Sequence, residues 1–220
     1  MKMTLKQEIE NFQKEMIPNI PKDVLHTLQR TSAELMAKNL EDRALKQGDT
    51  IPAFTLPDAT GTQVSSEQLL MDGPIVISFY RGGWCPYCNL ELKALQNILP
   101  EIKALNAQLV AISPELPDHS LATKEKHTLE FSVLSDQGNQ VARSFGLVFE
   151  LDKELAPMFK DKFNWDLIAI NGTEKVELPI PATYVVGKAG VAQFAFVNSD
   201  YSQRAEPELI LNVLQNINES

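Results

Sequence analysis

The first part of the chain, residues 1–47, carries apolar residues three or four positions apart, which predicts two amphipathic helices. Thr4 followed by Gln7 fits a capping box at the start of the first helix, because each side chain can bond the other residue's exposed amide. Pro18 and Pro21 separate the two helices, since proline lacks an amide donor and cannot continue a helix. The two apolar stripes consist of Leu5, Ile9, Phe12 and Met16, and of Leu25, Leu28, Leu35, Met36 and Leu40.

The second helix is expected to stop near Gly48, because glycine commonly ends a helix. We interpret residues 1–47 as an N-terminal helical extension that packs on the main domain, residues 48–220. A dimer contact is the alternative, since a single apolar stripe does not reveal its partner.

After Gly48, apolar runs of strand length alternate with helical patterns. Strand, helix and strand come first, and a hairpin around the turn 187–190 comes later, which predicts an α/β fold with a mixed central sheet flanked by helices. The segment 150–180 is the least regular, and we interpret it as an active-site flap or a long insertion. The predicted strands are 74–80, 109–113, 131–134, 183–186 and 191–197, and the predicted helices are 86–99, 117–128, 139–145 and 207–217.

Composition narrows the class of protein. The 220 residues are 44% hydrophobic and 22% charged, which is ordinary for a soluble globular protein. The net charge of −9 argues against nucleic acid and against an anionic membrane surface as partners. No apolar run approaches the ~20 residues of a membrane span. The start of the chain is charged and lacks the apolar core of a signal peptide, so we expect a cytoplasmic protein.

Cysteine usage is the most informative feature of the chain, which has only Cys85 and Cys88. Two thiols cannot form a disulfide scaffold for a chain of this length. They also cannot complete a structural zinc site, because the three histidines show no paired ligand spacing. No phosphate-binding or dinucleotide-binding motif is present, so we expect no metal and no cofactor.

The two cysteines lie where a buried strand gives way to a helix, a position typical of redox-active C-x-x-C pairs. The amides and the positive dipole end at a helix start stabilise a thiolate, which is the reactive form of cysteine. Residues three apart share one helix face, so a Cys85–Cys88 disulfide is geometrically possible. Buried structural thiols are the alternative. Trp84 either covers the thiols or only packs.

The sequence from about Gly48 to Phe196 resembles the peroxiredoxin-like (alkyl hydroperoxide reductase/thiol-specific antioxidant) family of the thioredoxin fold. Four segments carry the resemblance: GDTIPAFTLPDATG, VISFYRGGWCPYCNLEL, FSVLSDQGNQVARSFGL and PATYVVGKAGVAQFAFV. The resemblance implies a thioredoxin-like fold and an antioxidant oxidoreductase that reduces hydroperoxides. It also implies reduction of the enzyme by thioredoxin or a glutathione-type thiol, and a homodimer is possible.

The active-site segment departs from the family pattern. Arg81 replaces the usual proline and Cys85 replaces the usual threonine or serine, while Cys88 falls on the peroxide-attacking cysteine and Glu91 on an acidic residue that often follows it. Arg143 and Arg204 are candidates for positive charge near the thiols, although a surface role is favoured for both.

Ile180-Pro181-Ala182-Thr183 is similar to the thioredoxin pattern, in which a cis-proline faces the cysteine pair. We therefore predict a cis bond between Ile180 and Pro181, with the Ile180 carbonyl or the Ala182 amide free to pair with substrate. The candidate substrate-binding residues are Trp84, Pro181, Ala182 and Glu91.

Three functions follow from these observations. The first is a peroxidase that cycles Cys85 and Cys88 between dithiol and disulfide. The second is a general thiol–disulfide oxidoreductase acting on disulfide substrates, which the missing threonine favours. The third is a redox sensor without turnover. We expect Cys88 to attack the peroxide and Cys85, nearer the helix tip, to resolve the sulfenic acid and meet the reductant.

Overall fold

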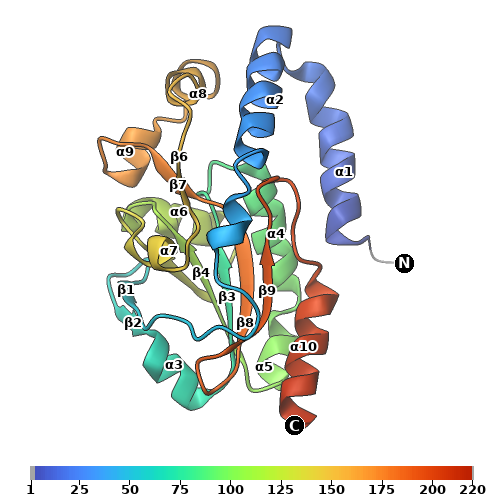
Figure 1. The fold of residues 1–220 in the computed structure, drawn as a ribbon, viewed down its shortest axis with the longest axis vertical. Helices are drawn as coiled ribbons and strands as arrows, with labels where there is room; N and C mark the ends of the chain where they lie inside the picture. Colours follow the sequence, from blue (N-terminus) through green and yellow to red (C-terminus); the bar gives the residue numbers. More distant parts are fainter. Residues whose placement is uncertain (1–2, 220) are drawn as a thin grey trace.

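The computed structural model describes residues 3–219, and residues 1, 2 and 220 of the predicted segments lie outside the described part. Figure 1 shows a central sheet between helices, with α1 and α2 at one end of the molecule. The elements are α1 (Leu5–Met16), η1 (Ile17–Asn19), α2 (Lys22–Met36), η2 (Leu40–Arg43), β1 (Thr55–Pro57), β2 (Gln63–Ser65), α3 (Ser66–Asp72), β3 (Ile75–Phe79), α4 (Pro86–Asn97), α5 (Leu99–Ala104), β4 (Gln108–Ser113), α6 (Pro117–Lys126), β5 (Ser132–Ser135), α7 (Gln140–Ser144), β6 (Val148–Glu150), α8 (Leu155–Phe163), α9 (Leu167–Asn171), β7 (Glu177–Pro179), β8 (Ala182–Val186), β9 (Ala192–Val197) and α10 (Pro207–Glu219).

The central sheet has five strands in the order β5-β4-β3-β8-β9. β3 pairs in parallel with β4, and β4 with β5, whereas β8 is antiparallel to both β3 and β9. The sheet is therefore mixed, and the predicted thioredoxin-like architecture is confirmed. Each predicted strand of the main domain is present within two residues of its predicted bounds.

Alternate residues of β3 face two separate cores, as the two-residue period of a strand requires. Val76 and Tyr80 belong to a core that includes residues of α4, α5, α10 and α1. Ile75, Ile77 and Phe79 belong to a second core that includes residues of α7. Because both faces are covered, β3 is buried along its whole length and holds the turn after Phe79 in a fixed place.

The N-terminal arm, which we define as residues 3–36 with α1 and α2, packs on the rest of the chain. The capping box of Thr4 and Gln7 is present. Leu5 and Ile9 belong to the same core as α4 and α10. The Glu206 carboxylate accepts hydrogen bonds from the exposed amides of Leu5 and Lys6, at 3.1 and 2.8 Å. The start of α1 is thus tied to a residue near the other end of the chain.

The predicted end of the second helix near Gly48 is wrong. α2 ends at Met36, and Asn39 adopts a left-handed conformation with φ of 46° before the short η2 turn. Asparagine tolerates this conformation better than most residues, so the chain turns here without a glycine.

The segment 150–180 is more regular than its pattern suggested. It contains α8, α9 and β7, and β7 pairs with β6 as a two-stranded sheet. A third core joins this segment to the arm, because Leu28 and Leu35 of α2 pack against buried residues that include Leu155 and Phe159. Figure 1 places α8 and α9 at the same end of the molecule as α2.

No helix among residues 3–219 is long and apolar enough to cross a membrane.

Candidate active site

The cysteine pair lies at the start of α4, where a tight turn leads from β3 into the helix, and Cys88 is in the first turn of that helix. Cys85 is the N-cap residue of α4 and Pro86 is its first helical residue, where the missing proline amide costs nothing. A Cβ atom at Gly83 would collide with the Thr123 side chain of α6. The Gly83 amide donates to the Glu115 carboxylate at 3.0 Å. The turn can therefore pass this close to α6 only without a side chain at position 83.

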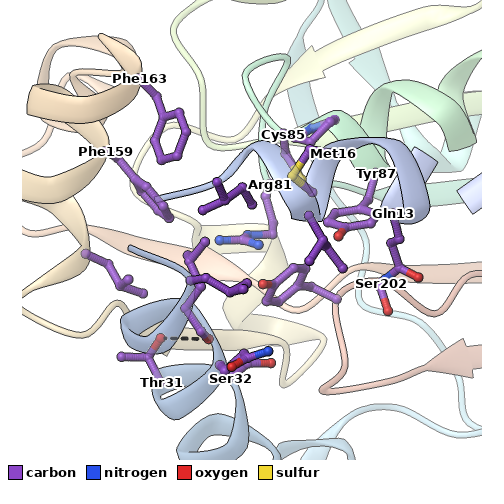
Figure 2. A pocket seen from close by; sticks show the side chains of 18 of the residues that line it. Gln13, Met16, Thr31, Ser32, Arg81, Cys85, Tyr87, Phe159, Phe163 and Ser202 are labelled. Atoms are coloured by element: carbon purple, nitrogen blue, oxygen red, sulfur yellow. Dashed lines mark hydrogen bonds between the residues drawn. The ribbon is translucent and has the colours of Figure 1, made fainter. Parts of the chain in front are cut away.

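Both cysteines are free thiols and almost fully buried. Their surroundings differ. Cys85 lines a cavity of about 600 Å³, whereas Cys88 is not among the residues that line it. Figure 2 shows Cys85 at the wall of this cavity with the Arg81 guanidinium near its centre. A substrate in the cavity meets Cys85 first.

The Cys88 sulfur accepts two hydrogen bonds. The donors are the Arg81 backbone amide at 3.5 Å and the Arg204 guanidinium at 3.4 Å. Both would stabilise a thiolate at Cys88 once one forms.

The two thiols differ in acidity. Burial disfavours the charged form of Cys85, but a hydrogen bond with Cys88 and the positive charges of Arg81 and Arg204 outweigh it and lower the pKa of Cys85 to about 6. Burial raises the pKa of Cys88 well above its ordinary value, and the neighbouring Cys85 raises it further. The two shifts run in opposite directions, so the pair accommodates one negative charge more readily than two.

Arg204 is a buried cation in the loop between β9 and α10. Its Nε lies 2.7 Å from the Glu91 carboxylate, and the two side chains are only 2% and 3% exposed. Thr183 donates to the other Glu91 oxygen at 3.0 Å. Burial raises the pKa of Glu91 to about 7, and the charge of Arg204 opposes that shift. The Glu91–Arg204 pair thus positions the guanidinium that contacts Cys88.

Arg81 lines the cavity together with Cys85. Its guanidinium lies over the rings of Trp84 and Tyr201, at 4.9 and 4.6 Å from their centroids. The side chain is buried, and its Nε has no hydrogen-bond partner within residues 3–219. The two aromatic faces hold the cation beside Cys85 without neutralising it.

The predicted substrate residues do not all meet at the cavity. Trp84 lines it and lies 5.6 Å from both Phe159 and Trp165, measured between ring centroids. Glu91 is buried behind Cys88 and acts through Arg204. Pro181 and Ala182 do not line the cavity, and Ala182 is paired on both sides, with Phe79 and Val197.

The predicted cis bond before Pro181 is wrong. Every peptide bond in residues 3–219 is trans. The Ile180 amide donates to the Leu147 carbonyl at 2.9 Å and so continues the pairing of β7 with β6. The chain therefore enters β8 already extended, and the thioredoxin-like contact between a cis-proline and the cysteine pair is absent here.

Tyr201 is a site residue that the sequence analysis missed, and Arg204 was named there only as a candidate for positive charge near the thiols. A surface role was favoured for Arg204, and the structure overturns it because the side chain is buried against Cys88. Arg143 does have the surface role, in an exposed ion pair with Glu177 at 2.6 Å. Nothing in the local sequence distinguishes these two arginines, since burial of Arg204 depends on a loop that folds back over α4.

Comparison with known proteins decides the family. The model of the AhpC/TSA family matches residues 47–195. The chain belongs to this family. Chloroplastic peroxiredoxin Q of Sedum lineare is 28% identical over 182 residues, which cover 83% of this chain and 84% of that protein. Peroxiredoxin Bcp of Escherichia coli K12 is 32% identical over 103 residues, covering 47% of this chain and 65% of that protein.

Solved structures of the AhpC/TSA fold are similar to this chain. The crystal structure of peroxidoxin BcpB from Mycobacterium tuberculosis superposes with a TM-score of 0.61 at 24% identity, covering 79% of this chain and 98% of that one. The predicted peroxiredoxin-like resemblance is confirmed. The family match begins at residue 47, so α1 and α2 lie outside it.

Proposed function

We propose that this AhpC/TSA protein is a thiol-dependent peroxidase that reduces hydroperoxides through a Cys85–Cys88 dithiol–disulfide cycle. The observation that carries the proposal is the Cys85 sulfur at the cavity wall, with a lowered pKa and a second thiol one helical turn away. Membership of a family that includes peroxiredoxins favours peroxide over a disulfide as substrate, and over a sensor without turnover.

In the first step the Cys85 thiolate attacks the terminal oxygen of the hydroperoxide. The O–O bond breaks, the sulfur becomes a sulfenic acid, and the leaving alkoxide takes a proton from solvent to give an alcohol. Arg81 and Arg204 stabilise the negative charge before attack. From the sequence we expected Cys88 to attack the peroxide. We now propose Cys85 instead, because Cys85 lines the cavity and its pKa is lowered.

In the second step Cys88 attacks the sulfur of the Cys85 sulfenic acid. The S–O bond breaks, hydroxide leaves with the Cys88 proton as water, and a disulfide forms. The negative charge on Cys85 is one reason for the raised pKa of Cys88, and oxidation removes that charge. The Arg81 amide and the Arg204 guanidinium then stabilise Cys88 as the second thiolate.

An external dithiol of the thioredoxin type, or glutathione, returns the disulfide to two thiols. A cytoplasmic location fits this cycle, because reducing compartments keep such pairs reduced. We also propose that residues 1–47 form an N-terminal extension and that residues 48–220 form the main domain. A homodimer is a further expectation, which sedimentation of the reduced protein tests.

The proposal is tested by mixing reduced protein with hydrogen peroxide, cumene hydroperoxide or a small disulfide in a stopped-flow instrument. We expect each peroxide equivalent to remove two free thiols within one chain and to react faster than the disulfide. Fast reaction with the disulfide alone would favour the oxidoreductase, and no reaction with any of them would favour the sensor.

A further inference from the structure

The cavity above Cys85 is much larger than a small peroxide needs. Its volume of about 600 Å³ lies in the range of pockets that hold drug-sized ligands, roughly 300–1,000 Å³. Each water in the liquid occupies about 30 Å³, so hydrogen peroxide would leave most of this space unfilled.

Much of the wall comes from the N-terminal arm. Phe12 and Met16 of α1 and Leu28 of α2 line one part, and Phe159 and Phe163 of α8 line another. Figure 2 shows Met16, Phe159 and Phe163 among the side chains that line the cavity together with Cys85. The arm lies outside the residues matched by the AhpC/TSA model, so this wall is an addition to the part shared with the family.

The arm is fastened around the cavity by contacts at several points. Glu206 caps α1, and the ring of Phe12 meets Tyr87 edge to face at 5.7 Å. Arg30 of α2 bridges to Glu154, directly before α8, at 2.7 Å. The wall therefore has a defined position relative to Cys85.

Charged side chains are few in the cavity wall. Among residues 3–219, Arg81 is the only lysine, arginine or histidine that lines the cavity, and it lies beside Cys85. Asp200 is the only acidic lining residue, and it sits next to Tyr201 in the loop after β9. Between α2 and α8 most lining side chains are apolar, and Gln29, Thr31 and Ser32 are uncharged, so this region suits hydrocarbon rather than a second charged group.

We propose that the arm and α8 form a binding site for the hydrocarbon part of a bulky, uncharged organic hydroperoxide, so that α1 and α2 select such substrates over hydrogen peroxide. This inference rests on the proposed peroxidase function. The peroxide group meets Cys85 beside Arg81, and the hydrocarbon displaces water from the wall formed by α2 and α8. After the O–O bond breaks, the corresponding alcohol leaves by the same cavity.

Binding can be measured without turnover. The chain has two tryptophans, Trp84 and Trp165, and both line the cavity. Cumyl alcohol, the product from cumene hydroperoxide, should change the tryptophan fluorescence of the reduced protein in a saturable manner. Ser32→Phe narrows the cavity from α2 and should weaken this binding at least tenfold. Ala33→Phe, at an exposed neighbour that does not line the cavity, is the matched control and should bind as wild type.

Selectivity is measured as the ratio of rate constants for cumene hydroperoxide and hydrogen peroxide. Ser32→Phe should lower this ratio at least tenfold, and Ala33→Phe should leave it unchanged. An unchanged ratio in Ser32→Phe, or an equal loss with both peroxides, would overturn the inference. If Ser32→Phe slows turnover with a protein reductant but leaves the ratio of the two rate constants unchanged, the cavity binds the reductant rather than the peroxide. If wild type reduces neither peroxide, the proposed function itself fails.

Discussion

At the scale of single residues, Cys85 and Cys88 have different surroundings, although their positions in the sequence are almost equivalent. Cys85 and Cys88 share the start of one helix, so the helix dipole acts on both. The cations differ in placement, since Arg81 lies on the cavity side and Arg204 on the buried side. The role of each arginine can therefore be tested by a separate substitution.

Replacing Arg81 by Met should raise the pKa of Cys85 above its value of about 6, because one of the charges that stabilise the thiolate is lost. The thiolate fraction, and with it the alkylation rate near pH 6, should fall roughly three- to tenfold. Alkylation by iodoacetamide across a pH series measures the midpoint. Arg143→Met, at an exposed arginine, is the control and should leave the midpoint in place. An unmoved midpoint in Arg81→Met would show that Arg81 does not set this acidity.

Replacing Glu91 by Ala should destabilise the fold, because the Arg204 charge is then left buried without its carboxylate. Folding raises the pKa of Glu91 to about 7, so the stability that this carboxyl contributes is fully present in acidic solution and falls as the pH rises to about 7; the loss in Glu91→Ala should therefore be largest in acidic solution. Loss of one partner of a buried pair typically costs ~3–5 kcal/mol, measured here by urea unfolding. The matched control is Glu130→Ala, whose ion pair with Lys103 is exposed, and it should cost less than ~1 kcal/mol. Equal effects would contradict the buried role of Glu91.

At the scale of elements, the position of Cys85 depends on how closely the turn before α4 approaches α6. This close approach explains why position 83 is a glycine. The turn is held by the Gly83 amide on Glu115 and by the absence of a side chain facing Thr123.

Gly83→Ala should slow the peroxide reaction by an order of magnitude or more, because the added methyl group pushes the turn and Cys85 away from α6. Thr123→Ala in the same chain removes the nearest colliding atoms and should restore part of the rate. Single-turnover kinetics of the two single variants and the double variant measure this coupling. Simple addition of the two effects would show that the collision is not the cause.

At the scale of the whole molecule, the sequence predicted what depends on local pattern. The strands, the capping box of α1 and the redox pair at a helix start all follow from residues that are neighbours in the chain. The sequence offered Arg204 and Arg143 equally as candidates and favoured a surface role for both, because the burial of Arg204 depends on contact with Cys88, more than a hundred residues away in the chain. The cis-proline prediction was wrong for a similar reason, since the pairing of Ile180 with Leu147 sets the path of the chain there.

The cavity is also a property of the whole molecule. It exists because the arm, α8 and the turn before α4 come together from three separate parts of the sequence. The apolar stripes of the arm predicted that it packs on the main domain, and the structure shows that part of this apolar surface also lines the cavity beside Cys85.

The central claim is that Cys85 attacks the peroxide and Cys88 resolves the product. The most direct test treats reduced Cys85→Ser and Cys88→Ser proteins with one equivalent of cumene hydroperoxide and locates sulfenic acid by mass spectrometry of trapped peptides. We expect fast oxidation in Cys88→Ser, with sulfenic acid accumulating at Cys85, and slow oxidation in Cys85→Ser. Fast oxidation at Cys88 in Cys85→Ser, with an inert Cys88→Ser, would contradict the account and restore Cys88 as the attacking residue.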